Sequence, residues 1–264
     1  MPVQLTILGS GSSGNCAFVE AGETRLLVDA GLSGRQIRQR LLSIGRAPET
    51  LAGILITHEH SDHTQGLVGL AAKLQIPVYC NRLTGEAVMR QLDLKLDLHL
   101  FGTGTSFDIG DLVVDTFNLP HDACDPVGFL LHTAAGNIGF LTDLGCATKL
   151  IMQRVQSADV LLLEANYDLK LLQDDPRRPW SVKQRILSRH GHLSNEAATE
   201  VAEQLLSARL RHLYLGHLSG DCNRPELARG AVAQMLERTG ANHVRVEVTS
   251  QDIPCPTLTL DRAP

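Results

Sequence analysis

Short apolar runs separated by glycine- and serine-rich loops dominate the first sixty residues, a pattern typical of buried strands with tight connections. One stretch has a different period. Ser33 and Gln36 have the spacing of a capping box, and the apolar positions after them recur every three or four residues up to Gly45. The pattern predicts one helix among strands. The predicted strands are Gln4–Leu8, Ala17–Glu20, Thr24–Asp29 and Gly53–Ile56.

The apolar pattern then predicts a helix over Gln65–Leu74, ended by Pro77, and a mainly β region after it. Strands and helices alternate towards the end. The predicted strands are Leu112–Leu119, Ile138–Leu141, Val160–Leu163, Leu213–Leu215 and His243–Val248, and the predicted helices are Val182–Ser188, Asn195–Leu206 and Pro225–Arg238. A β-rich half followed by alternating elements favours a layered α/β fold over a β-barrel. No linker is visible, so we expect a single domain over residues 1–264.

Composition narrows the class of protein. The 264 residues are 43% hydrophobic and 20% charged, which is ordinary for a soluble globular protein. The net charge of -5 excludes the basic surface of an architectural nucleic-acid binder, so contact with a polyanion would need local positive charge or bound metal. The sequence has no signal-peptide pattern, no membrane-length apolar run and no CxxC pair among its six cysteines. We therefore expect a cytoplasmic protein with reduced thiols and no membrane partner.

The segment ITHEHSDHTQG carries the strongest chemical signal. His58, His60, Asp62 and His63 follow a predicted apolar strand directly, and imidazole and carboxylate are the ligands that divalent metals prefer. The segment is not the HExxH helix of the zincins, because an aspartate and not a histidine stands four residues after His58. A polar surface loop is the alternative, but so many ligand types in six residues favour a metal site.

Three more polar residues follow predicted strands further along the chain. They are His121 in FNLPHDACD, Asp143 in GFLTDLG and His217 in LYLGHLS. Each one alone could be a strand-end residue that local hydrogen bonds satisfy. As an ordered set downstream of HEHSDH, they predict the remaining metal ligands.

HxHxDH followed by a histidine, an aspartate and a histidine resembles the metallo-β-lactamase fold superfamily. The resemblance implies a four-layer αββα sandwich with two divalent metal ions, zinc or manganese, at the edge of its sheets. The implied ligands are His58, His60 and His121 for the first metal, Asp62, His63 and His217 for the second, and Asp143 as a bridge.

The resemblance can be narrowed. GSSGN, LLVDAGLS, THEHSDHTQGL, HDACDPVGF, TDLG, EANYD, GHLSN and HLSGDCNRPELA together are similar to the YycJ/WalJ-like family, which is similar in turn to tRNase Z, the RNase J group and the PhnP-type phosphodiesterases. The chain departs from that family at Tyr167, where the family commonly has histidine. The segment between Asp143 and His217 has no room for a β-CASP insertion, so RNase J-like RNA clamping is not expected.

The tetrapeptide GHLS occurs twice, and its two histidines are predicted to do different work. His217 is a predicted ligand, whereas His192 precedes a predicted helix and is the candidate proton donor to a leaving oxygen. Glu164, after the strand Val160–Leu163, is its expected partner, which resembles the Glu–His pair of tRNase Z. Local roles are the alternatives: a backbone hydrogen bond for His192 and a salt bridge for Glu164. Asp62 is expected to orient the attacking hydroxide as well as bind metal.

Candidate substrate contacts lie outside the ligand set. Arg178 belongs to a basic cluster around Trp180 that could hold phosphates and offer a stacking face. The alternative is a solvated amphipathic helix with Trp180 in the core. The glycine- and serine-rich loop after the first strand could present amide groups to a phosphate. The remaining candidate contacts are Ser12, Ser13, Asn15, Ser219 and Asn223.

These features together predict a dinuclear metal-dependent phosphodiesterase, an exonuclease that hydrolyses DNA or RNA by attack of a metal-bound hydroxide. One alternative is a metal-dependent hydrolase of a cyclic phosphodiester, lactone or thioester, because the same metal core serves those reactions. Another is a metal-binding regulatory protein with little catalysis. The sequence leaves a homo-oligomer open.

Overall fold

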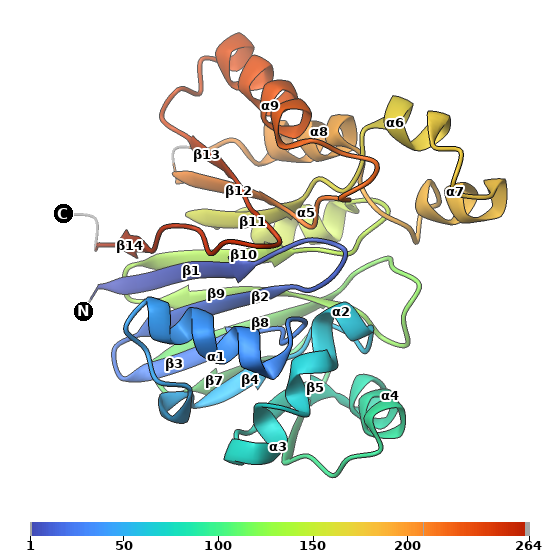
Figure 1. Ribbon diagram of the computed structural model, residues 1–264. Coiled ribbons are helices and arrows are strands. Elements are labelled where there is room, and N and C mark those ends of the chain that lie inside the picture. Colours follow the sequence, from blue (N-terminus) through green and yellow to red (C-terminus); the bar gives the residue numbers. More distant parts are fainter. Residues whose placement is uncertain (1, 208, 262–264) are drawn as a thin grey trace.

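Two β-sheets packed face to face form the centre of the protein in the computed structural model, which describes residues 2–207 and 209–261 (Figure 1). Among these residues the first sheet has the order β14-β1-β2-β3-β4-β5-β6 and the second β13-β12-β11-β10-β9-β8-β7. The strands of the first sheet are β1 Val3–Gly9, β2 Cys16–Ala21, β3 Thr24–Val28, β4 Gly53–Leu55, β5 Val78–Asn81, β6 Leu98–Phe101 and β14 Leu258–Leu260. Those of the second are β7 Ser106–Ile109, β8 Leu112–Asn118, β9 Val127–Thr133, β10 Gly136–Leu141, β11 Val160–Glu164, β12 His212–Gly216 and β13 Arg245–Val248.

Helices cover the outer face of each sheet, and α6 and α7 project from one end of the molecule (Figure 1). On the side of the first sheet lie α1 Gly34–Ser43, α2 Ser61–Thr64, α3 Ala71–Leu74 and α4 Arg82–Leu92, with the 3₁₀ turns η1 Pro48–Thr50 and η2 Gln65–Leu67. With the second sheet lie α5 Lys149–Val155, α6 Leu169–Asp174, α7 Trp180–Ile186, α8 Asn195–Leu205 and α9 Pro225–Thr239. Within the described ranges, no helix combines the length and apolar character needed to cross a membrane.

The alternation of side chains along a strand explains the four layers. In β11, Val160 and Leu162 face the core between the two sheets. Leu161 and Leu163 face the opposite way, into the apolar layer beneath the helices. Successive side chains of a strand point to opposite faces, so a strand covered on both sides must be apolar throughout, as VLLLE is until its last residue. The predicted layered α/β fold is confirmed.

Several strand ends meet at one edge of the sandwich. β3 and β4 are parallel in the first sheet, and β10, β11 and β12 are parallel in the second. Parallel strands bring their carboxyl ends to a common edge, which is where α/β proteins commonly bind ligands. The polar residues at or just after these ends are Asp29, His58, Asp143, Glu164 and His217.

The predicted helix Gln65–Leu74 is wrong as one continuous element. The structure has the turn η2 Gln65–Leu67 and then the short helix α3 Ala71–Leu74. The cause is tertiary packing: the amide of Gly66 donates to the carbonyl of Ala30, and a Cβ at Gly66 would overlap the carbonyl of Leu32. Helices α4, α5 and α6 and strand β14 were not predicted. The capping box at Ser33 and Gln36 is confirmed.

Late segments of the chain hold its beginning in place. β14 pairs antiparallel with β1, with Leu260 opposite Val3. The Arg40 guanidinium, on α1, donates to the carbonyls of Leu8 and Gln251 and so ties the end of β1 to the segment before β14. The loop after β1 is thereby braced from both directions.

Removal of a large side chain from the layer between the sheets should destabilise the whole fold. Phe129, on β9, is fully buried there. We expect Phe129→Ala to lower the free energy of unfolding by about 3–5 kcal/mol, because the cavity collapses only partly. Leu42→Ala, on the exposed face of α1, is the matched control and should cost about 0.5 kcal/mol or less. Urea unfolding followed by circular dichroism measures both, and equal losses would contradict the described core.

Candidate metal centre

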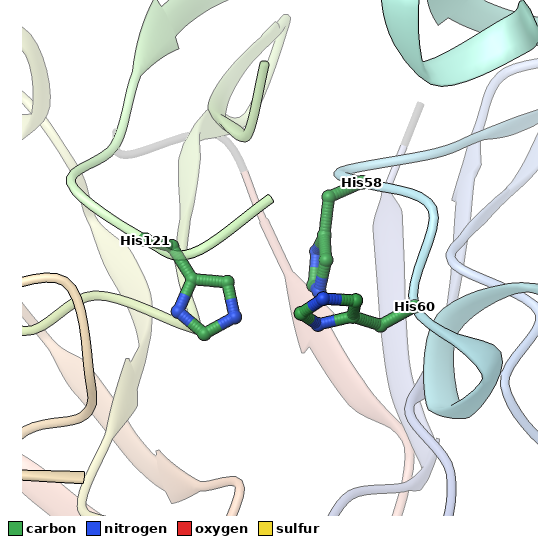
Figure 2. A group of neighbouring side chains, drawn as sticks. All are labelled: His58, His60 and His121. Atoms are coloured by element: carbon green, nitrogen blue, oxygen red, sulfur yellow. The ribbon is translucent and has the colours of Figure 1, made fainter. Parts of the chain in front are cut away.

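Three imidazoles from the two sheets converge at the common edge. His58 and His60 lie between β4 and α2, and His121 lies after β8 in the other sheet. Figure 2 shows His121 facing the two histidines across the gap between the sheets. One ring nitrogen of each lies within 4.8 Å of the others, and the ring centroids are 4.6 to 5.2 Å apart. The structure thus brings the three predicted ligands of the first metal together.

The predicted ligands of the second metal form an adjoining group. His217 Nε2 lies 3.3 Å from an Asp62 carboxylate oxygen, and His63 Nε2 lies 3.5 Å from the same oxygen. Asp143 lies between the two groups, because its carboxylate is 3.1 Å from His63 Nε2 and 3.7 Å from His121 Nε2.

The ring nitrogens that face away from the cluster are held by hydrogen bonds. His63 Nδ1 donates to Asp29 Oδ2 over 2.7 Å, and His121 Nδ1 donates to the carbonyl of Gly191 over 3.1 Å. Thr57 Oγ1 lies 3.0 Å from His58 Nδ1 and donates to Asp29. A proton held at Nδ1 leaves Nε2 with a free lone pair, which is the tautomer that binds metal.

Buried atoms without partners test whether a metal fits. Among the described residues, His58 Nε2 and His121 Nε2 are buried and have no hydrogen-bond partner, and they lie beside the Asp143 carboxylate. Such groups are costly unless something compensates them. Their chemistry, imidazole nitrogen with carboxylate oxygen, suits a divalent ion such as zinc or manganese. The residues fit the metal that the fold implies.

The electrostatics of the cluster also suit a cation. Burial, and then the neighbouring His63, hold the pKa of His58 well below its ordinary value, so this ring is neutral. Burial opposes ionisation of Asp143, but His217 and His63 bring its pKa well below the usual range. The pKa of His63 is raised well above its ordinary value, because the carboxylates of Asp29 and Asp143 outweigh burial. A divalent ion that binds His63 would displace the extra proton that the raised pKa keeps on this ring.

One carboxylate connects the two GHLS histidines. Glu164 Oε1 accepts from His192 Nδ1 and from His217 Nδ1, each over 2.7 Å. Its other oxygen accepts from the amides of Leu193 and Leu144. Burial would raise the pKa of Glu164, but the two histidines lower it to about 2. Glu164 in turn outweighs burial and raises the pKa of His192.

The sequence did not indicate three residues that orient the cluster. Asp29 follows β3, Thr57 precedes His58, and Ser10 Oγ accepts from the amide of His217 over 2.8 Å. Asp29 could have been found as a polar residue at the end of an apolar strand. Asp29, Asp143 and His217 also have positive φ of 61°, 61° and 55°, which non-glycine residues seldom adopt. Such strain gathers at functional sites.

The candidate substrate contacts are not equivalent. Ser12 and Ser13 are exposed on the loop after β1. Asn15, Ser219 and Asn223 are buried, and their side chains bond within the protein: Asn15 with Ser10, Ser219 with the amide of Cys222, and Asn223 with Asn195. The Arg178 guanidinium pairs with Asp175 and Asp221. Trp180 is 60% exposed, so its placement in the core is wrong.

Comparison with known proteins defines the class. Residues 24–217 match the family model described as a β-lactamase superfamily domain. The solved metallo-β-lactamase fold protein YhfI from Bacillus subtilis superposes with a TM-score of 0.75 at 17% identity, covering 98% of this chain and 99% of that one. The chain therefore belongs to the β-lactamase superfamily and has the metallo-β-lactamase fold. The described residues between Asp143 and His217 form α5, β11, α6, α7, α8 and β12, without a β-CASP insertion.

Two relatives narrow the family. Exodeoxyribonuclease YycJ of Bacillus anthracis is 37% identical over 91% of this chain and 91% of its own length. Exodeoxyribonuclease WalJ of Streptococcus pneumoniae serotype 2 is 41% identical over 88% of this chain and 87% of its own length. The chain belongs to the YycJ/WalJ family, as its motifs predicted.

Asp29→Ala should weaken metal binding although Asp29 is not a candidate ligand, because His63 would lose the partner that fixes its tautomer. We expect a 10- to 100-fold loss of affinity. Asp111→Ala is the matched control, since Asp111 is exposed and also accepts from a backbone amide. Calorimetric titration of the metal-free proteins with zinc measures the change. Equal affinity of Asp29→Ala and wild type, with native circular dichroism, would contradict this role.

Proposed function

We propose that the protein is a metal-dependent phosphodiesterase that acts as an exonuclease on a nucleic acid strand. The observation that carries the proposal is the Glu164–His192 pair placed beside the candidate metal cluster. Hydrolysis of a phosphodiester expels an alkoxide that needs a proton, and this pair can supply one. The family relatives support the proposal, because YycJ and WalJ are named exodeoxyribonucleases. Those names favour DNA over RNA as substrate.

The cluster would hold two divalent ions, zinc or manganese. The proposed ligands are His58, His60 and His121 for one ion, Asp62, His63 and His217 for the other, and Asp143 for both. Ions bound there would activate water and neutralise the phosphoryl oxygens.

His192 is the proposed proton donor. Its Nδ1 proton is held by Glu164 Oε1, so an imidazolium has its second proton on Nε2. The side chain is 21% exposed and lies at the rim of the cluster. Transfer of the Nε2 proton to the leaving oxygen would accompany breakage of the bond between that oxygen and phosphorus, while the oxygen of a water that has already released one proton to solvent forms the new bond. The ionised Glu164 stabilises the imidazolium before transfer.

Asp62 has a second proposed task. It is the least buried of the candidate carboxylate ligands, and one of its oxygens lies 3.3 Å from His217 Nε2. The carboxylate could accept a hydrogen bond from the attacking water and aim its lone pair at phosphorus. Ser12 and Ser13 remain the proposed contacts to the strand, because their loop is exposed. The paired Arg178, and the buried Asn15, Ser219 and Asn223, would instead support the site from within.

A substrate panel tests the function. The protein is assayed with zinc or manganese on single-stranded DNA and RNA labelled at either end, on bis(p-nitrophenyl) phosphate, on a lactone and on a thioester. We expect stepwise shortening of the labelled DNA. Turnover confined to the lactone or the thioester would overturn the proposal in favour of a small-molecule hydrolase. Metal binding with no turnover of any substrate would favour a regulatory protein.

Replacement of the two GHLS histidines should separate a proton donor from a ligand. His192→Ala should retain its metal and lose 10²- to 10⁴-fold in turnover of DNA, with a much smaller loss on a p-nitrophenyl ester, whose leaving group needs no proton. His217→Ala should lose metal and activity on both substrates. Metal analysis of the dialysed variants beside the two rates gives the comparison. An emptied metal site in His192→Ala, or equal losses on both substrates, would refute this division.

A further inference from the structure

A pocket of about 190 Å³ has His192 in its lining and none of the predicted metal ligands. Two segments form it: the loop that carries His121, and helix α7 with the turn that follows. Arg185, from the basic cluster around Trp180, belongs to it, whereas the candidate contacts Ser12, Ser13, Asn15, Arg178, Ser219 and Asn223 do not. The lining residues are Asp122, Val182, Arg185, Ile186, Gly191 and His192.

We propose that this pocket binds the nucleoside on the leaving side of the scissile phosphodiester. The inference rests on the proposed function. The leaving oxygen must lie within reach of the proton donor, so the leaving group extends past His192. His192 lines the pocket, and its Nδ1 lies 3.8 Å from Asp143 Oδ1 in the cluster. The pocket also borders the cluster through Asp122, whose Oδ1 lies 3.3 Å from His121 Nε2.

The walls suit a nucleoside better than a phosphate. Val182 and Ile186 supply apolar surface. The two charged side chains of the lining neutralise each other, because Arg185 Nε pairs with Asp122 Oδ2. The Asp122 carboxylate would repel a phosphate, whereas it would not repel a neutral base. A base has apolar faces and a polar edge, which match an aliphatic wall, the planar guanidinium of Arg185 and a carboxylate acceptor.

The pocket is built as one unit with the metal cluster. The Gly191 carbonyl accepts from His121 Nδ1, which faces away from the cluster. Gly191 also packs against the end of α7 so closely that a Cβ would overlap the carbonyls of Ile186 and Arg185. Gly191 is therefore held both to the candidate ligand His121 and to the end of α7, and these two contacts fix the pocket relative to the cluster. Such a preformed cavity can position one side of a substrate.

The test uses a single-stranded DNA 10-mer and metal-loaded protein. Mass spectrometry of the products first shows on which side of the cleaved bond the phosphate stays. The nucleotide on the other side, the leaving side, is then made abasic in a second 10-mer, and the one on the phosphate side in a third. We expect the wild type to lose about 10-fold in kcat/KM with the leaving-side abasic strand, the size of one base contact, and less with the third strand.

Val182→Trp should remove this discrimination by filling the pocket. Val182 is 38% exposed, so the larger ring need not disturb the core. Leu150→Trp, on the exposed surface of α5, is the matched control and should keep the wild-type ratio. Arg185→Ala removes the opposite wall and should also reduce the ratio of kcat/KM between the intact strand and the leaving-side abasic strand. It serves as a second variant if Val182→Trp does not fold.

Three results would overturn the assignment. The first is discrimination on the phosphate side of the bond instead of the leaving side. The second is an unchanged ratio in both folded pocket variants, which would refute the pocket while the nuclease function stands. The third is a wild type that cleaves neither this DNA strand nor the RNA strand of the same sequence, which would refute the proposed function and the pocket with it.

Discussion

The buried carboxylate of Glu164 is the constraint on which the rest of the site depends. It has no exposed surface, so its charge must be compensated inside the protein. One oxygen accepts hydrogen bonds from both GHLS histidines, and the other accepts hydrogen bonds from two backbone amides. These groups come from the end of β12, the turn before α8 and the loop after β10. Compensation of one charge therefore fixes the relative positions of a candidate ligand, a candidate proton donor and the segment next to Asp143.

Orientation of the remaining histidines follows the same logic. Asp29, Thr57 and the Gly191 carbonyl hold the nitrogens that face away from the cluster. They lie in three different loops, after β3, after β4 and before α8, so the cluster forms only when both sheets are packed together. Positive φ at Asp29, Asp143 and His217 shows that the surrounding structure holds the backbone in an unfavourable conformation there. The site is organised by groups that would not touch a metal themselves.

The candidate ligands His58, His121, Asp143 and His217 were predictable because each follows a strand, and strand ends can be read from the chain. The sequence did not predict that His192 and His217 bind the same oxygen of Glu164, because no spacing along the chain indicates it. A sequence also does not show whether a side-chain amide is buried and hydrogen-bonded within the protein, as that of Asn223 is, or whether it faces a ligand. The break in the helix after Gln65 was hidden for a similar reason: Gly66 contacts the loop after β3, a contact that depends on the finished fold.

The pairing of β14 with β1, and the hydrogen bond from His217 to Ser10, have a consequence for how the protein is made. Both join segments more than two hundred residues apart. During synthesis, the first strand leaves the ribosome long before its neighbour exists, and loop closure over such a separation is slow. The nascent chain therefore lacks the candidate ligand His217 and its hydrogen bond to Ser10 until residue 217 emerges, and it exposes an unpaired edge of β1 until residues 258–260 emerge. A translation product that ends before residue 217 would therefore lack both a candidate metal ligand and an anchor for the loop after β1.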